Sequence, residues 1–391
     1  MTPSPSASAA PPSRLRRDEV TYTAYLALAG WAWFLYGFGA MLTLLVEEQG
    51  ISRTVGGLHL TAQALGGLVS GLLVAPVVRR VRRRGALILG AALIVSGIAL
   101  LLIGAPTALT LCAALVLGTG GSLSIIAINP ILVQHHGAAG AAVISEANAV
   151  AAGVGLIAPL AVGAGIRAGL GWRPALLVTA AVMTVVAWRV RALPRPTASV
   201  DAGLPPRGSG AGRLPAAIWP LMAVIVLCVG VEFSMTTWTA ELLRREIGMA
   251  DSAAAAGVSA IVAGMALGRL LLSRLALRWH PRPLLFGAIG VALCGWGLLW
   301  AASSPGPAVA GLILAGLGIG GHFPLGLSLM LAHAHGQQDK ASGALSIGVS
   351  AGIGLAPFAL GALADATSVH TAFLVVPGLL LVATGVLVAV V

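Results

Sequence analysis

Residues 24–46 read AYLALAGWAWFLYGFGAMLTLLV and contain no charged side chain. A helix of about 20 apolar residues crosses the hydrocarbon core of a bilayer, so this stretch predicts a transmembrane helix. The preceding residues, 1–20, are rich in Ser, Pro and Ala and contain no apolar core of the kind found in signal peptides. We expect residues 1–20 to form a disordered cytoplasmic tail.

Comparable apolar runs follow along the whole chain, separated by short polar or Gly- and Pro-rich turns. A Pro-, Arg- and Gly-rich segment at 193–215 divides them into two sets of six, which predicts bundles at 21–192 and 216–391 joined by a cytoplasmic linker. The other expected spans are 55–78, 86–104, 108–133, 144–166 and 174–192, then 217–240, 252–273, 284–302, 308–332, 342–364 and 370–391. The sequence therefore predicts an all-α membrane protein with twelve transmembrane helices.

Composition excludes most other classes of protein. Of 391 residues, 58% are hydrophobic and 9% are charged, and the mean hydropathy is +0.96, far from the mixture typical of soluble domains. Cys112, Cys228 and Cys294 all lie inside apolar runs, which favours packing over disulfide or metal chemistry. Gly118-Thr119-Gly120 lacks the preceding strand and the following Gly-Lys-Ser/Thr of a nucleotide site. We expect no enzyme, no cofactor and no bound metal.

The net charge of +11 would suit a nucleic-acid partner, but most arginines lie at the ends of apolar runs. If the N-terminus is cytoplasmic, 17 of the 23 basic residues lie on the cytoplasmic side and five on the other. This asymmetry follows the positive-inside rule and predicts two cytoplasmic termini, with a lipid bilayer as partner and no nucleic acid. Heavy use of Ala, Gly and Arg beside a single lysine, Lys340, favours the cytoplasmic (inner) membrane of a bacterium.

The second half of the chain repeats the first at a displacement of 198 residues. Matching positions include Leu44 with Leu242, Glu48 with Glu246, Gly50 with Gly248, Gly118 with Gly316, Pro159 with Pro357 and Gly163 with Gly361. Duplication of a six-helix unit is typical of transporters, whose binding site lies between the repeats.

Two bundles of six helices, a basic linker and basic loops after the second and eighth spans resemble the major facilitator superfamily. The segment Gly264-Met265-Ala266-Leu267-Gly268-Arg269 and the Gly171-Trp172-Arg173 turn are similar to motifs of that family. Its first-half loop motif is degenerate, because the acidic residue is missing beside the basic run at 79–84. The resemblance covers about residues 20–391. It implies a monomeric secondary active transporter that moves a small molecule by alternating access.

Val229-Gly230-Val231-Glu232, followed by Trp238, resembles the fucose-permease-like sugar porter branch. We therefore expect a small polar solute, with a sugar favoured, and protons that are transported with it by symport. Two alternatives stay open: proton-driven efflux of drug-like or amphipathic compounds, and a sensor of the same fold that binds a solute without moving it.

Ionisable residues inside the spans are the strongest candidates for function, because burying a charge in a bilayer is costly. We predict that Glu232 and His322 couple protons to transport, although each could instead serve helix packing. The expected substrate cavity is lined by aromatic and polar residues of four spans, which could also have structural roles. These cavity residues are Trp33, Tyr36, Asn129, Trp238 and Ser346.

A cytoplasmic gate is the last expectation. Glu146 opens the fifth span, and Arg269 lies near the cytoplasmic end of the eighth. These two spans face each other across the bundle boundary in the resembling family, so a Glu146–Arg269 pair could hold the cytoplasmic side shut in the outward-facing state.

Overall fold

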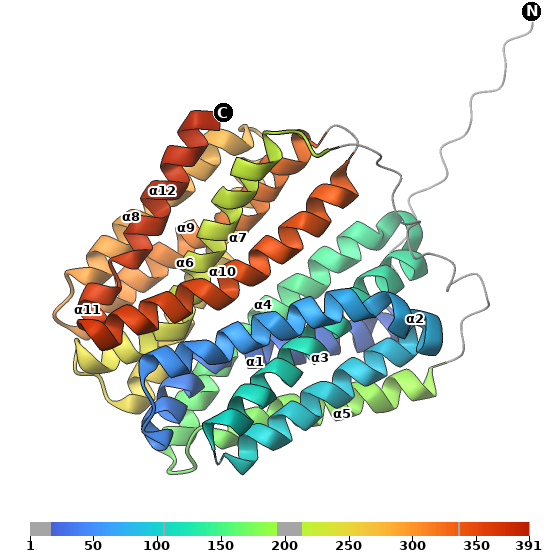
Figure 1. Cartoon of the computed structure of the whole chain (residues 1–391), viewed down its shortest axis with the longest axis horizontal. Helices are drawn as coiled ribbons and strands as arrows, with labels where there is room; N and C mark the ends of the chain where they lie inside the picture. Colours follow the sequence, from blue (N-terminus) through green and yellow to red (C-terminus); the bar gives the residue numbers. More distant parts are fainter. Residues whose placement is uncertain (1–16, 105, 194–212, 335–336, 391) are drawn as a thin grey trace, which may run out of the picture.

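A computed structural model describes residues 17–104, 106–193, 213–334 and 337–390, and the regular elements in these ranges are all helical (Figure 1). In the first half they are α1 (Glu19–Gln49), α2 (Arg53–Ile103), α3 (Thr107–His136), the short 3₁₀ helix η1 (Gly137–Ala139), α4 (Gly140–Arg167) and α5 (Arg173–Ala192). The second half contains α6 (Ile218–Arg245), α7 (Asp251–Leu275), α8 (Pro281–Trp300), α9 (Pro305–Ala332), α10 (Gln338–Ala366), α11 (Val369–Ala372) and α12 (Val375–Val390).

The predicted tail and linker fall mostly outside the described residues, which exclude 1–16 and 194–212. The helix α1 begins at Glu19 because Asp18 caps it: the Asp18 side chain accepts a hydrogen bond from the Thr21 amide. It ends at Gly50, whose φ of 62° suits glycine and stops the helix.

The described helices provide the twelve predicted crossings. Eleven segments are long and apolar enough to span a membrane, and α2 accounts for two crossings because its 51 residues are broken at Arg82, where φ is +60° and ψ is 174°. Both arms of α2 pack on the same part of α3: Gly66 approaches Thr119, and Gly90 approaches Gly120. The chain therefore reverses at the break, in the Arg-rich segment that was predicted to be a loop.

The structure repeats its closest helix contacts at positions 198 residues apart. A Cβ added at Gly118 would collide with the Gln63 carbonyl, and one added at Gly316 would collide with the Ile261 carbonyl. The same holds for Gly66 against Leu115 and Gly264 against Ile313. Small residues let helix backbones approach closely in a bilayer, so the duplicated glycines give the two halves the same internal packing. The predicted pseudo-symmetric pair of six-helix bundles is confirmed.

The two bundles meet at one end and spread apart toward the other (Figure 1). We call the first the sealed end; α1 finishes there at Gln49 and α6 at Arg245. The opposite, terminal end carries the start of α1 and the finish of α12. Helices of the two halves pack across the boundary, among them α1 with α6 and α7, α2 with α10, and α4 with α7. These contacts bring residues of both halves together beneath the sealed end.

Candidate functional site

A buried carboxylate and a guanidinium meet where the two bundles adjoin. Glu232, near the middle of α6, exposes 12% of its side chain, and its Oε1 lies 3.6 Å from Nη2 of Arg269 on α7. Tyr36 of α1 interacts with both groups, so the first bundle also contributes to the site. The Tyr36 ring packs directly on Gly155 of α4, where a Cβ would collide with it. The structure thus joins Glu232, Arg269 and Tyr36 across the boundary.

A close backbone contact between the bundles lies one helical turn away, on the side of the sealed end. A Cβ on Gly39 of α1 would collide with the Thr236 carbonyl of α6 and would lie 2.9 Å from the Thr237 Cα. The helices can touch here only because residue 39 lacks a side chain. The site formed by Glu232, Arg269 and Tyr36 therefore lies one helical turn further from the sealed end than this backbone contact.

Closer to the sealed end, ion pairs also join the two bundles. We call the backbone contact at Gly39 and these ion pairs, with the side chains packed around them, the seal. Glu241 of α6, whose side chain is 5% exposed, accepts hydrogen bonds from Arg53 of α2 at 2.9 and 3.2 Å. It also accepts one from Arg244 at 2.8 Å, and Arg244 forms a second ion pair with Glu47 of α1. Arg53 and Glu47 belong to the first bundle and their partners to the second, so this network joins the bundles.

Asp365 of α10 adds a second type of contact. Its carboxylate accepts hydrogen bonds from the backbone amides of Arg53 and Thr54, at 3.0 and 2.7 Å, and from the Thr54 hydroxyl. The carboxylate therefore caps the first turn of α2 from the other bundle, where the unpaired amides and the helix dipole favour a negative charge. The indole of Trp238 donates to the Pro357 carbonyl of α10 within the second bundle, at 2.9 Å, and its ring lies against Gly56 of α2 in the first bundle.

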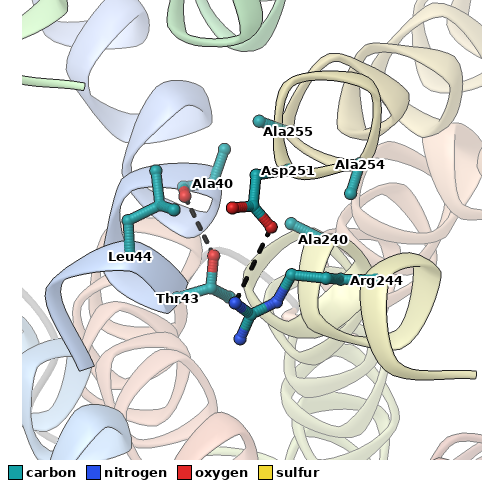
Figure 2. Close-up of a pocket in the computed structure, with 8 residues that line it drawn as sticks. All are labelled: Ala40, Thr43, Leu44, Ala240, Arg244, Asp251, Ala254 and Ala255. Carbon is teal, nitrogen blue, oxygen red and sulfur yellow. Dashed lines mark hydrogen bonds and ion pairs between the residues drawn. The ribbon is translucent and has the colours of Figure 1, made fainter. Parts of the chain in front are cut away.

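A small, partly open pocket lies within the seal (Figure 2). Its walls come from α1, α6 and α7, and half of the residues that line it are alanines. Figure 2 shows Arg244 and Asp251 facing each other across it, 3.7 Å apart, and the Thr43 hydroxyl turned back to the Ala40 carbonyl. The pocket offers few free polar groups and lies away from Glu232, so we assign it to the seal rather than to solute binding.

The other predicted site residues do not join Glu232. The His322 ring, 2% exposed, lies beside the Ala288 carbonyl of α8, and neither ring nitrogen forms a hydrogen bond with the described residues. Trp33 donates to the Ala175 carbonyl of α5, inside the first bundle. Both were expected at the central cavity, and both face neighbouring helices of their own bundle instead. The positions of these residues along their helices gave their depth but not the face on which they lie.

Three further candidates have different surroundings. Trp238 is 1% exposed and belongs to the seal. Asn129 is half-buried on α3, and Ser346 is exposed on α10, where its hydroxyl bonds the Ser342 carbonyl of its own helix. Ser350, one turn further along α10, approaches Ser122 of α3 near Gly67, so polar groups of both bundles meet there.

The expected gate pair is not formed in this structure. Glu146 pairs with Arg17 at 2.7 Å, and the Arg269 side chain extends to Glu232 rather than toward the terminal end. The bundles are separated at the terminal end, where such a gate would act (Figure 1). The pair is therefore a prediction for a different conformation.

Sequence reasoning missed the charged network of the seal, although a signal was present. Several charges at the sealed end have opposite signs at positions 198 residues apart, which are Arg53 and Asp251, Glu47 and Arg245, and Arg167 and Asp365. When two repeats bring equivalent ends together, like charges at equivalent positions repel and opposite charges attract. The reversed signs therefore indicate ends that meet.

A cluster at the terminal end offers metal-ligating atoms. One ligand atom each from Asp18, His135 and His136 lies within 4.8 Å of the others. Burial alone would raise the pKa of Asp18, but hydrogen bonds from Thr21 and His135 outweigh burial and hold that pKa below its ordinary value. His136 bonds the Thr21 hydroxyl at 2.8 Å. Because these groups already bond one another, the cluster also serves to tie α1 to α3.

Comparison with known proteins finds a family model that matches this chain. The family model of the Major Facilitator Superfamily matches residues 23–344 and 222–391. An uncharacterized transporter, y4wD of Sinorhizobium fredii, is 29% identical over 157 residues, which are 40% of this chain and 42% of that protein. The match thus spans less than half the length of that curated relative.

Two solved structures show the same fold. The nucleoside transporter NupG superposes with a TM-score of 0.74 at 14% identity, over 95% of this chain and 98% of that one. A variant of the E. coli fucose:proton symporter FucP gives a TM-score of 0.63 at 17% identity, over 96% of this chain and all of that one. Identities this low support a shared fold and do not identify a solute.

Proposed function

Because the chain belongs to the Major Facilitator Superfamily, we propose that it is a secondary active transporter for a small polar solute, coupled to protons through Glu232. Its moving units are residues 21–192 and 216–391, connected by 193–215. Sugars are the favoured solutes, in keeping with the fucose:proton symporter among its structural relatives. The proposed location is a bacterial inner membrane, with both termini cytoplasmic, and the transporter acts as a monomer.

The observation that carries this proposal is the position of the Glu232–Arg269 pair. It is a charged pair inside the spans, next to a close contact between the bundles, and Tyr36 connects it to the first bundle. A mid-membrane carboxylate is costly to maintain unless it is paired or protonated. Exchange between these two states, as the bundles move about the seal, would couple the charge on Glu232 to the conformation.

With both termini cytoplasmic, the described conformation is open toward the cytoplasm and closed outward. The sealed end then faces the outside, and the ion pairs of Arg53, Glu241 and Arg244 hold it shut. Alternating access requires these contacts to break when the terminal end closes.

Transport assays in proteoliposomes test the coupling. In Glu232→Gln, uphill accumulation driven by a proton gradient should fall to background, whereas exchange of labelled for unlabelled solute should continue, because exchange needs no net proton movement. A matched control is Glu19→Gln, which removes an exposed carboxylate that pairs with Arg189 inside the first bundle. Uphill transport at the wild-type level in Glu232→Gln would exclude Glu232 as the coupling group.

The same assay separates the alternatives. A solute sensor would bind its ligand without accumulating it in wild-type vesicles. A proton-driven efflux protein would accumulate amphipathic cations when the gradient is reversed. Neither result is expected under this proposal.

A further inference from the structure

The pair of Arg269 and Glu232 is loose in comparison with the ion pairs of the seal. Arg53 directs two N–H groups at one oxygen of Glu241, at 2.9 and 3.2 Å. The Arg269 guanidinium approaches Glu232 at 3.6 Å, beyond hydrogen-bonding distance, and Glu232 is its one carboxylate partner among the described residues. A guanidinium has five N–H donors that suit bidentate binding of a carboxylate. Arg269 therefore keeps donors for a second, better-fitting anion.

The two members of this pair are also unequally accessible. Arg269 exposes 37% of its side chain, whereas Glu232 exposes 12%. Arg269 lies on the side of Glu232 toward the terminal end, since α7 runs from the sealed end at Asp251 to the terminal end at Leu275. A solute that approaches from the terminal end would meet the positive group before the negative one. The site thus presents a cation to the solute.

We propose that the transported solute carries an anionic group, most simply a carboxylate as in a sugar acid, and that this group binds Arg269 in place of Glu232. The phenol of Tyr36 interacts with Arg269 from the first bundle and would hold the guanidinium in position. This inference rests on the proposed function, because it names the class of solute for the same site.

When the carboxylate of the solute replaces that of Glu232 at Arg269, binding of the solute becomes coupled to protonation of Glu232. Once the solute has taken Arg269, Glu232 is a buried carboxylate without its counter-ion, and an uncompensated buried charge is strongly unfavourable. Glu232 then takes up one proton, so one anion and one proton move together without net charge. The ionisable groups around this carboxylate are Arg269 on α7, Tyr36 on α1 and Cys228 one turn away on α6.

Binding of matched compounds tests the solute class. The probes are galactose and galacturonate, glucose and glucuronate, and glycerol and glycerate, each pair differing by a carboxylate. Thermal unfolding of the purified protein in detergent reports binding, because a ligand of the native state raises the unfolding temperature. We expect stabilisation by the acid of at least one pair and not by its neutral counterpart.

Four variants identify the group responsible. Arg269→Gln should abolish the shift, and Arg269→Lys should weaken the affinity about tenfold, because an ammonium lacks the bidentate geometry of a guanidinium. Glu232→Gln should bind the acid about tenfold more tightly, since the competing carboxylate is gone. The control, Arg274→Gln, removes an exposed arginine of the same helix and should bind as the wild type does.

Three results would overturn the inference: equal binding of acid and neutral members, binding that survives in Arg269→Gln, or no stabilisation by any of the acids. Failure of the proposed coupling has a different signature. If Glu232→Gln still accumulates solute uphill while acids bind through Arg269, the coupling role of Glu232 is wrong and the solute class stands.

Discussion

The ion pairs at the sealed end and the ion pair in the middle of the bundles are built differently. Glu241 accepts from Arg53, Arg244 and Arg245, and Arg244 has further partners in Glu47 and Asp251. Arg269 has Glu232 alone, at 3.6 Å. A network with several partners keeps its charges compensated when one contact lengthens, whereas a single loose pair can exchange its partner. The difference suggests that the first holds a conformation and the second binds.

The largest effect on the closed state of the sealed end is expected for Glu241→Gln. This change leaves Arg53, Arg244 and Arg245 together without the carboxylate that neutralises them, and removing one partner of a buried pair costs about 3 kcal/mol. The closed state of the sealed end should be destabilised by about that amount, discounted for the 25% exposure of the Arg53 side chain. A reporter cysteine at position 43, placed in a variant without the native cysteines, should react at least tenfold faster with a membrane-impermeant thiol reagent.

The control for this change is Glu19→Gln, because the Glu19–Arg189 pair lies within one bundle. Equal reactivity of the reporter in both variants would show that the charged network does not hold the sealed end closed.

The second prediction tests whether backbone contact or charge closes the seal. Gly39→Ala places a Cβ against the Thr236 carbonyl, and overpacking of this kind costs about 2 kcal/mol. Since the strain disappears when α1 and α6 separate, the variant should favour the conformation that is open at the sealed end by about tenfold or more. The same cysteine-reactivity assay measures the shift.

Gly153→Ala is the matched control, because a Cβ at Gly153 of α4 meets nothing within 4 Å. If the two alanine variants gave the same reactivity, the close approach at Gly39 would have no part in closing the seal.

A third, smaller effect is expected at Trp238. Trp238→Phe keeps an aromatic ring but removes the hydrogen bond to the Pro357 carbonyl of the same bundle, which is worth about 1 kcal/mol and holds the indole against Gly56 of α2. Reactivity of the reporter should increase about fivefold, less than in either variant above. Trp188→Phe changes an indole that is 68% exposed and should have no effect. A larger change for Trp238→Phe than for Glu241→Gln would reverse the ranking of the charged network and the indole.

The fold could be predicted because its determinants repeat along the sequence. Apolar length fixed each span, and the 198-residue displacement identified two related halves before any contact was known. The helix α2 was predicted as two spans for the same reason, since the arginines around Arg82 are too costly inside a bilayer.

The sequence predicted how deep the site residues lie in the membrane, but it did not predict which residues contact one another. Glu232, Arg269 and Tyr36 were each selected, yet for three different roles, because hydropathy gives the depth of a residue and not the face it presents. His322 shows the same limit, as it lies at a suitable depth but faces α8. A sequence that must fold into two conformations also encodes contacts of both, so the pairs present in one conformation cannot be read from charge alone.

The smallest expected effect concerns Glu146 at the terminal end. In the described conformation this carboxylate pairs with Arg17, whose side chain is 49% exposed, and the hydrogen bond and charge of Glu146 raise the pKa of Arg17 above its ordinary value. Closure of the terminal end would have to exchange Arg17 for Arg269. Exposed ion pairs contribute less than about 1 kcal/mol, and the two pairs oppose each other in the balance between conformations.

Glu146→Gln should therefore shift the equilibrium toward the conformation open at the terminal end by less than about fivefold. Arg269→Gln should shift it in the same direction but less far, because it also removes the pair with Glu232 that stabilises the described conformation. In the double variant that exchanges the two charges, attraction across the boundary returns and closure should be partly restored. A reporter cysteine at the terminal end measures all three. If the exchanged variant were as open as Arg269→Gln alone, the two residues would not meet in any conformation, and the charged contacts that switch the protein would be confined to the sealed end.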